Sequence, residues 1–199
     1  KFSGKLEVRL FELDGVGHIP LPFIGGVGAA GKYSIGQIDL GLKGGVVQGA
    51  DVSGQARAAW GTATGSVFVG DDPNNPYEEI GATVNVLQAE AAGDVTLGEG
   101  GYGTGVKVRG KAAAEAVAGD IFQEQNIPVG DGNTVSTRAK VGASAGSVGG
   151  EYGGWAEQDK GTGRTHVGGI GKVEAGVGLG VSGDVSYGPA YEDRGGRKF

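Results

Sequence analysis

Three short motifs in the sequence are of types that carry chemistry in other proteins. Residues 26–31 read Gly-Val-Gly-Ala-Ala-Gly, a GxGxxG pattern whose glycines let the backbone approach a pyrophosphate. The same segment continues to Lys32 as GxxxxGK, a partial phosphate-binding loop in which Tyr33 replaces the hydroxyl residue that binds Mg²⁺. Residues 142–146 read Gly-Ala-Ser-Ala-Gly, the GxSxG pattern of a serine nucleophile. Each motif works only at the junction of a strand and a following helix.

The surroundings of these motifs argue against all three sites. Gly occupies 45 of 199 positions, so such matches are expected by chance. Residues 32–42 alternate between apolar and polar side chains and predict a strand where a helix is required. Ser144 likewise lies inside an alternating run, although Asp159 and His166 follow it in the order of a hydrolase triad. We therefore predict no catalytic residues and no nucleotide cofactor.

Metal sites are also not predicted. The chain has no Cys and only two His, His18 and His166, neither of which has a second His at ligand spacing. The acidic segment 71–79 offers carboxylate oxygens to Ca²⁺, but its spacing departs from the EF-hand pattern and two Pro stiffen it. A solvated loop is the simpler interpretation, so we predict neither cofactor-binding nor metal-binding residues.

Charge and apolar patterning limit the partners. With 17 basic and 23 acidic residues the net charge is -6, which argues against nucleic acid. A membrane is an unlikely partner, since no basic amphipathic stretch and no spanning apolar run is present. The aromatic residues are scattered, and the charged segment 193–198 before Phe199 is unlike a membrane strand. Tyr152 and Trp155 have the residue types to stack a sugar, yet filling gaps beside Gly is the favoured role, and any small-molecule ligand stays unknown.

Alternation with a period of two residues dominates the chain and predicts strands. Residues 106–118 place Val and Ala on one face and charged side chains on the other, so we predict a strand despite the helix propensity of the alanine run. The alternation changes parity near Leu10 and again near Gln37, which indicates bulges. The prediction is an all-β fold of eight to twelve long antiparallel strands in closely stacked sheets, forming a sandwich or an elongated, solenoid-like form.

Polar and Gly/Pro-rich segments divide these strands. Irregular connections are predicted at 18–31, 71–79 and 121–133, the last with a turn at Asp131-Gly132. We predict a single Gly-rich β domain, 1–199, whose parts are N-terminal strands with the Pro/Gly connection (1–50), a small-residue β region (51–187) and a polar tail (188–199).

Glycine inside a strand needs a reason, because it weakens the strand by backbone entropy and lost packing. In the segment 172–187, Val and Leu share one face while Gly176, Gly178 and Gly180 lie on the other. A second sheet at close distance, a neighbouring subunit or a flat ligand would each explain this row and the row Ala112–Ala118. A drift of composition towards small residues, without special packing, is the alternative.

Two segments resemble a known type of protein. Residues 137–153 (TRAKVGASAGSVGGEYG) and 172–185 (KVEAGVGLGVSGDV) resemble the Ala/Gly/Ser-rich β repeats of secreted proteins, among them the non-catalytic scaffold segments of bacterial polymorphic toxins. The resemblance extends over residues 50–187. It implies secretion and a structural role, and it transfers no active site.

These observations predict a non-enzymatic structural protein, a secreted and self-associating β subunit of a filament, sheath or coat. Its partners would be copies of itself, because poorly specified register and exposed edges recruit further strands. A first residue Lys1 and the lack of Cys fit an extracellular or cell-surface location. The alternatives are a binding or scaffold segment of a larger secreted protein or toxin, and a hydrolase that uses Ser144 and His166.

Overall fold

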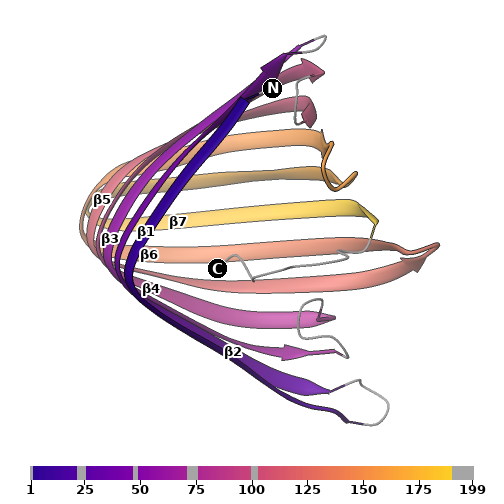
Figure 1. Ribbon diagram of the computed structural model, residues 1–199, viewed down its shortest axis with the longest axis horizontal. Helices are drawn as coiled ribbons and strands as arrows, with labels where there is room; N and C mark the ends of the chain where they lie inside the picture. The colour runs from indigo at the N-terminus through magenta and orange to yellow at the C-terminus, as the bar shows by residue number, and fades with distance from the viewer. Residues whose placement is uncertain (1, 22–25, 47–48, 71–75, 100–102, 190–199) are drawn as a thin grey trace.

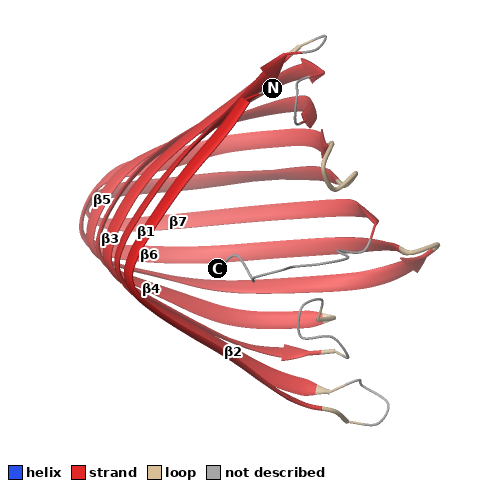
Figure 2. Ribbon diagram, viewed as in Figure 1, coloured by secondary structure: helices blue, strands red, loops and turns tan. Residues whose placement is uncertain are grey.

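The computed structural model describes residues 2–21, 26–46, 49–70, 76–99 and 103–189. Seven strands pair antiparallel with their neighbours in sequence, in one sheet of order β1-β2-β3-β4-β5-β6-β7 (Figures 1 and 2). The prediction of an all-β fold with long antiparallel strands is confirmed, but the described strands number seven in place of eight to twelve and form one open sheet in place of closely stacked sheets. Within the described ranges there is no helix able to cross a membrane. The strands are β1 (Phe2–Ile19), β2 (Val27–Val46), β3 (Ala50–Val69), β4 (Glu78–Glu99), β5 (Gly103–Gly130), β6 (Asn133–Asp159) and β7 (Thr165–Pro189).

A transverse bend crosses the sheet near the middle of the strands. The pairing of β1 with β2 passes from Arg9–Gln37 directly to Phe11–Ile35, so Leu10 and Gly36 are left out of the register. The same interruption, with one residue skipped in each strand, recurs in every later pair up to β5–β6, whereas between β6 and β7 the register skips Gly146 of β6 and no residue of β7. The skipped residues form one row across the sheet. We call this row the crease, and it consists of Leu10, Gly36, Trp60, Leu87, Ala116 and Gly146, reaching β7 at Gly176.

Backbone conformation explains the bend. Leu87, Gly36 and Gly146 have φ values of 48°, 61° and 61°, in the left-handed region that interrupts an extended strand. Glycine adopts this region without steric cost, and a Cβ on Gly146 would lie only 2.8 Å from the Cβ of Ala116. Figure 1 shows the strands turning back at this level. The crease divides every strand, and with them the sheet, into two arms. The upper arm lies on the side of the crease where β1 begins at Phe2, and the lower arm lies on the side where β1 ends at Ile19.

The crease also reverses which residues face which way. In β1, Leu6 and Val8 face outward before the crease, and Phe11 and Leu13 face outward after it, because the alternation restarts at Leu10. The parity changes predicted near Leu10 and Gln37 are explained by this row. The prediction that 106–118 presents one apolar face is wrong for the same reason, since the crease at Ala116 turns the following Ala118 inward, where it is buried.

Two predicted connections turn out to be largely strand. β1 continues to Ile19 and β2 begins at Val27, so the irregular segment is shorter than 18–31. β5 continues through most of 121–133 and ends at the predicted turn, where Asp131 and Gly132 have φ values of 53° and 72°. Polar composition misled the prediction because one whole face of this sheet is polar.

The other two predicted boundaries fall partly outside the described residues. Of the predicted loop 71–79, residues 71–75 lie outside them, and Glu78 and Glu79 begin β4. Of the predicted tail 188–199, residues 188–189 belong to β7 and the remainder lies outside the described residues.

The inner face, between the two arms, is polar, and the outer face is apolar. The buried apolar set is small and consists of Ala30, Ala59, Phe68, Ala118 and Phe122. Most other buried side chains carry hydroxyl, amide or carboxylate groups, whereas outer residues such as Val173 and Leu179 are 76% and 71% exposed. This is the reverse of a sheet that packs its apolar face on a core and its polar face in water.

The predicted glycine row divides at the crease. Gly176 lies in the crease region with a φ of 78°, and a Cβ there would meet nothing within 4 Å. Gly178 and Gly180 point inward, where a Cβ would lie 2.3 Å from Ser144 Oγ and 2.6 Å from Lys172 Cγ respectively. The close approach expected at these two glycines is therefore to polar side chains of the same chain.

Gly178→Val should destabilise the fold. The added side chain would overlap Ser144 and Glu174, and overpacking of this kind lowers the free energy of unfolding by about 1–3 kcal/mol. Gly171→Val is the matched control in the same strand, because a Cβ at Gly171 meets nothing within 4 Å, and its effect should stay within about 0.5 kcal/mol. Thermal unfolding followed by circular dichroism measures both, and equal effects would contradict the inward orientation of Gly178.

Candidate functional site

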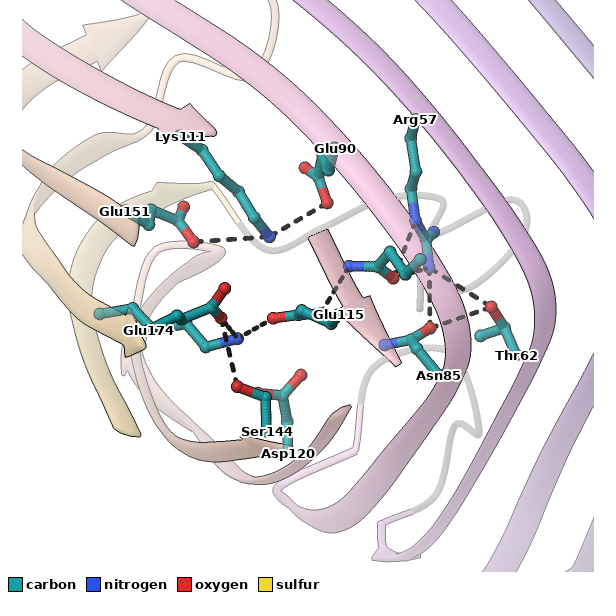
Figure 3. A network of polar contacts seen from close by, with 12 residues as sticks. Arg57, Thr62, Asn85, Glu90, Lys111, Glu115, Asp120, Ser144, Glu151 and Glu174 are labelled. Carbon is teal, nitrogen blue, oxygen red and sulfur yellow. Dashed lines mark hydrogen bonds and ion pairs between the residues drawn. The ribbon is translucent and has the colours of Figure 1, made fainter. Parts of the chain in front are cut away.

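A network of polar side chains fills the inner face beside the crease. Its members come from five consecutive strands and from both arms, and Figure 3 shows several of them, among them Arg57, Asn85, Glu115 and Glu174, directed into the space between the strands. We call it the inner cluster. It consists of Arg57 and Thr62 of β3, Asn85, Gln88 and Glu90 of β4, Lys111 and Glu115 of β5, Ser144, Ser147 and Glu151 of β6, and Lys172 and Glu174 of β7.

Lys172 is held between two buried carboxylates. Its Nζ contacts both Glu115 and Glu174, whose side chains are 1% and 0% exposed. Burial acts to lower the pKa of Lys172, but hydrogen bonds to the two carboxylates leave it raised. Burial raises the pKa of Glu115, and its hydrogen bond with Glu174 raises it further. Burial also acts to raise the pKa of Glu174, yet the bonds with Glu115 and Lys172 hold it below its usual value. Glu115 is thus the carboxyl that keeps a proton more readily.

Arg57 joins the two arms across the crease. Its Nη2 donates to Asn85 Oδ1 at 2.8 Å in the lower arm and to Gln88 Oε1 at 2.9 Å in the upper arm. Thr62 Oγ1 donates to the same Asn85 oxygen at 2.9 Å, and Gln88 Nε2 donates to Glu115 Oε2 at 3.2 Å. Arginine suits this position because its planar group of five donors binds several acceptors at fixed angles.

Lys111 is the third cation of the cluster and also lies in the upper arm. Lys111 Nζ lies 3.0 Å from Glu90 Oε2 and 3.6 Å from Glu151 Oε2, and Arg109 Nε donates to Glu151 Oε1 at 2.8 Å. Each buried carboxylate of this part thus has a basic partner, as buried charges require.

A separate set of contacts closes the two arms at the β6–β7 end. Arg164, in the turn after β6, is fully buried, and its guanidinium donates to Thr134 Oγ1 at 2.8 Å, Ser136 Oγ at 3.0 Å and Pro189 O at 2.6 Å. Those acceptors belong to the lower arm, while the turn that carries Arg164 caps the upper arm. We call this contact the Arg164 latch.

Asp184 adds a second tie between the arms. Trp155 Nε1 in the upper arm donates to Asp184 Oδ1 at 2.6 Å, and His166 Nδ1 lies 3.1 Å from Asp184 Oδ2. Burial acts to raise the pKa of Asp184, but the hydrogen bonds from His166 and Trp155 hold it below its usual value. The Asp184 carboxylate is therefore stabilised in its ionised form.

The hydrolase constellation is not assembled. Ser144 lies beside the crease and donates to Ser147 Oγ at 3.0 Å and Glu174 Oε1 at 3.4 Å. His166 lies near the start of β7 and bonds to Asp184. Asp159 accepts from the backbone N–H groups of Gly161 and Thr162 in the β6–β7 turn. The three residues of the hypothetical triad therefore have three different sets of partners.

The remaining candidate residues take structural positions. Gly28 and Gly31 of the GxGxxG pattern lie within β2. The same strand extends over residues 32–42, so the prediction of a strand there is confirmed. His18 stacks on Phe68 with ring centroids 6.0 Å apart, and its Nε2 lies 3.1 Å from Gly70 O. Among the described residues no three His, Cys, Asp or Glu side chains form a metal-binding group.

The aromatic pair considered for sugar binding is split between the two faces. Tyr152 lies on the outer face and is 67% exposed, whereas Trp155 points inward to Asp184. A joint stacking platform is therefore absent from this pair.

Sequence reasoning did not find the inner cluster. The signal was present as charges that recur at alternate positions, at 107, 109 and 111 in β5 and at 172 and 174 in β7. Alternation of this kind looks the same for a solvated face and for a buried one, and only the folding of the sheet at the crease distinguishes them. Comparison with protein-family models, curated proteins and solved structures finds no match to this chain.

Proposed function

We propose that this chain is a non-enzymatic structural protein whose copies join through the free edges of the sheet. The observation that carries the proposal is the pair of long edges. Within the described residues, β1 (18 residues) pairs with no strand other than β2, and β7 (25 residues) pairs with no strand other than β6, so each has a side on which no described strand is paired. Such edges are templates for further strands.

The exposure of β1 supports this assignment. Nearly all of its residues are exposed, including Leu10 at 75%, although the strand alternates apolar and charged side chains as its paired neighbours do. A strand added to β1 would continue both faces of the sheet, with apolar residues outside and charged residues inside. On this proposal, the residues of β1 are exposed because the structure contains a single subunit, to which no second copy has added a strand.

We assign the assembled protein to an extracellular or cell-surface filament, sheath or coat. A chain without Cys tolerates oxidising surroundings, and the net charge of -6 does not favour nucleic acid. The resemblance of residues 137–153 and 172–185 to β repeats of secreted proteins points the same way.

Proline substitutions at the edge test the proposal. The backbone N–H groups of an antiparallel strand point alternately to the two sides, so of Gly15 and Val16 one donates toward β2 and the other toward the free edge. A Gly15→Pro and a Val16→Pro variant are therefore a matched pair. We expect large, concentration-dependent particles for the wild type in sedimentation velocity. One proline variant should keep the wild-type circular dichroism and thermal unfolding but lose assembly, because proline is tolerated where the N–H faces away from the ladder.

A strictly monomeric wild type at high concentration would contradict self-association. It would favour the second candidate, a binding or scaffold segment of a larger secreted protein or toxin. Unchanged assembly in both proline variants would contradict the role of the β1 edge.

A further inference from the structure

The outer face of the sheet carries almost no charge. Among the described side chains of the seven strands, Lys, Arg, Asp and Glu residues lie at inward-facing positions, with two exceptions. These exceptions are Glu78 and Glu99, the first and last residues of β4. The sheet face that is exposed to water ordinarily carries the charged side chains. Contact with water therefore does not explain why the outer face of this sheet lacks them.

The few polar residues of the outer face form rows near the ends of the arms. In the upper arm Thr104 pairs with Glu99 and Gln158, and Gln158 pairs with Thr165. In the lower arm Gln125 pairs with Glu78 and Thr137. Between these rows, on both sides of the crease, the outer residues are Val, Leu, Ile, Ala, Gly and aromatic types, with Gln123 of β5 as the one polar exception among the described strands. The outer face is thus an apolar band with polar margins.

We propose that this apolar band is covered by the acyl chains of a lipid bilayer. In β5 the band runs from the crease at Ala116 to Thr104 on one side and Gln125 on the other, roughly 30–40 Å of strand in each arm at about 3.3 Å per residue. The hydrocarbon core of a bilayer is about 30 Å thick, so each arm has the length to cover it. The proposal goes beyond the proposed assembly and rests on the outer face alone.

A protein partner fits the band less well. A specific interface covers about 800 Å² on each partner and contains hydrogen bonds among its apolar contacts. Exposed apolar residues here come from all seven strands and both arms, for example Leu6, Ile38, Val67, Val106, Val148 and Leu179. They lie on a convex surface (Figure 1) that a single docked protein would contact only in part. Lipid chains cover such a surface without matching its shape.

Burial of the apolar band in lipid is compatible with the proposed pairing of copies through the β1 and β7 edges. Unpaired backbone groups cost several kcal/mol each in hydrocarbon, so β1 and β7 would need strand partners there. The expectation from sequence that a membrane is an unlikely partner rests on helices, basic stretches and aromatic girdles. It does not address the apolar band, which appears only after the parity reversal at the crease is known.

The two tryptophans provide an internal test. Trp60 lies in the crease and is 61% exposed, whereas Trp155 points inward and donates to Asp184. The full-length variant Trp155→Phe keeps Trp60, whose fluorescence reports on the outer face. The full-length variant Trp60→Phe keeps Trp155, whose fluorescence reports on the inner face. The probes are vesicles of neutral phosphatidylcholine with brominated acyl chains, compared with the same vesicles without bromine.

We expect the chain to co-sediment with the vesicles. Bromine should strongly quench Trp60 emission, shifted to the blue, and leave Trp155 emission unchanged. Leu179→Arg, within the band, should weaken vesicle binding about tenfold or more, whereas Asn133→Arg at the end of the lower arm should not.

Absence of co-sedimentation, or equal quenching of the two tryptophans, would overturn the proposal. A third outcome would also overturn it and would favour a second copy of this chain as the partner that covers the band. In that case aqueous acrylamide would fail to quench Trp60 in the absence of lipid, and the brominated vesicles would not quench it either. Edge-dependent assembly is measured independently by the proline pair.

Discussion

Replacing Lys172 with Met is expected to lower the free energy of unfolding by about 3–5 kcal/mol at pH 7. The ammonium is in contact with Glu115 and Glu174, and its removal leaves two buried carboxylates facing each other without a cation. In the wild type the pKa of Lys172 is raised, so its contribution is complete below the unfolded Lys pKa of about 10.4 and is lost only as the pH rises through the folded value.

The loss in this variant should depend on pH in a defined direction. Without the cation, both carboxyl groups acquire pKa values above the unfolded Glu value of about 4.3, because each disfavours the charge of the other. The folded variant then binds more protons than the unfolded chain, so acidification from pH 7 toward pH 5 restores part of its stability. Thermal unfolding at the two pH values measures the change.

Lys140→Met is the matched control for this experiment. Lys140 forms an ion pair of 2.8 Å with Asp120, but its side chain is 41% exposed, and pairs of that kind contribute only about 0–1 kcal/mol. Adding Glu115→Gln to Lys172→Met removes one of the two facing charges and should recover part of the loss. An effect of Lys172→Met no greater than that of Lys140→Met, or one independent of pH, would contradict the paired-carboxylate description.

Replacing Arg164 with Met is expected to cost about 3 kcal/mol or more and to separate the ends of the arms at β6 and β7. The guanidinium donates to hydroxyl and carbonyl oxygens of the lower arm, and each buried acceptor left without a donor costs about 1–3 kcal/mol. Hydrogen exchange should therefore increase at the ends of β6 and β7 while the crease stays protected.

The Arg164 latch depends on geometry as well as on charge. Arg164→Lys keeps the charge but replaces a planar group of five donors by a single ammonium, so it should lose much of the same stability. Arg138→Met is the control at a 47% exposed arginine in the neighbouring strand. Full stability in Arg164→Lys would show that charge alone suffices, and wild-type exchange in Arg164→Met would contradict the latch.

Much of the fold follows from local sequence pattern. Alternation of apolar and polar residues predicts strands at 6–10, 106–118 and 172–187, and it locates the parity change at Leu10. The Asp131-Gly132 turn is also local, because both residues must adopt positive φ there. Strand ends were predicted less well, since polar residues in 121–130 resemble a loop although they continue β5.

The inner cluster lay beyond the reach of sequence reasoning. Arg57 and Asn85, or Glu115 and Lys172, are far apart along the chain, and their contact depends on register between strands and on the fold at the crease. The motif at Ser144 pointed to a nucleophile, whereas its neighbours in space are Ser147 and Glu174. Spacing in sequence predicts chemistry only when the local structure that the chemistry needs is also present.

By itself the sequence determined the β-strand character, the antiparallel class and the small residues that permit close packing. These features depend on neighbours one or two positions away, and the period of two records them directly. Only the tertiary structure decided which face is inside. A single skipped residue in the register, such as Leu10 in β1 or Ala116 in β5, exchanges the faces of everything that follows, so the direction of the charged and apolar sides is set by the crease.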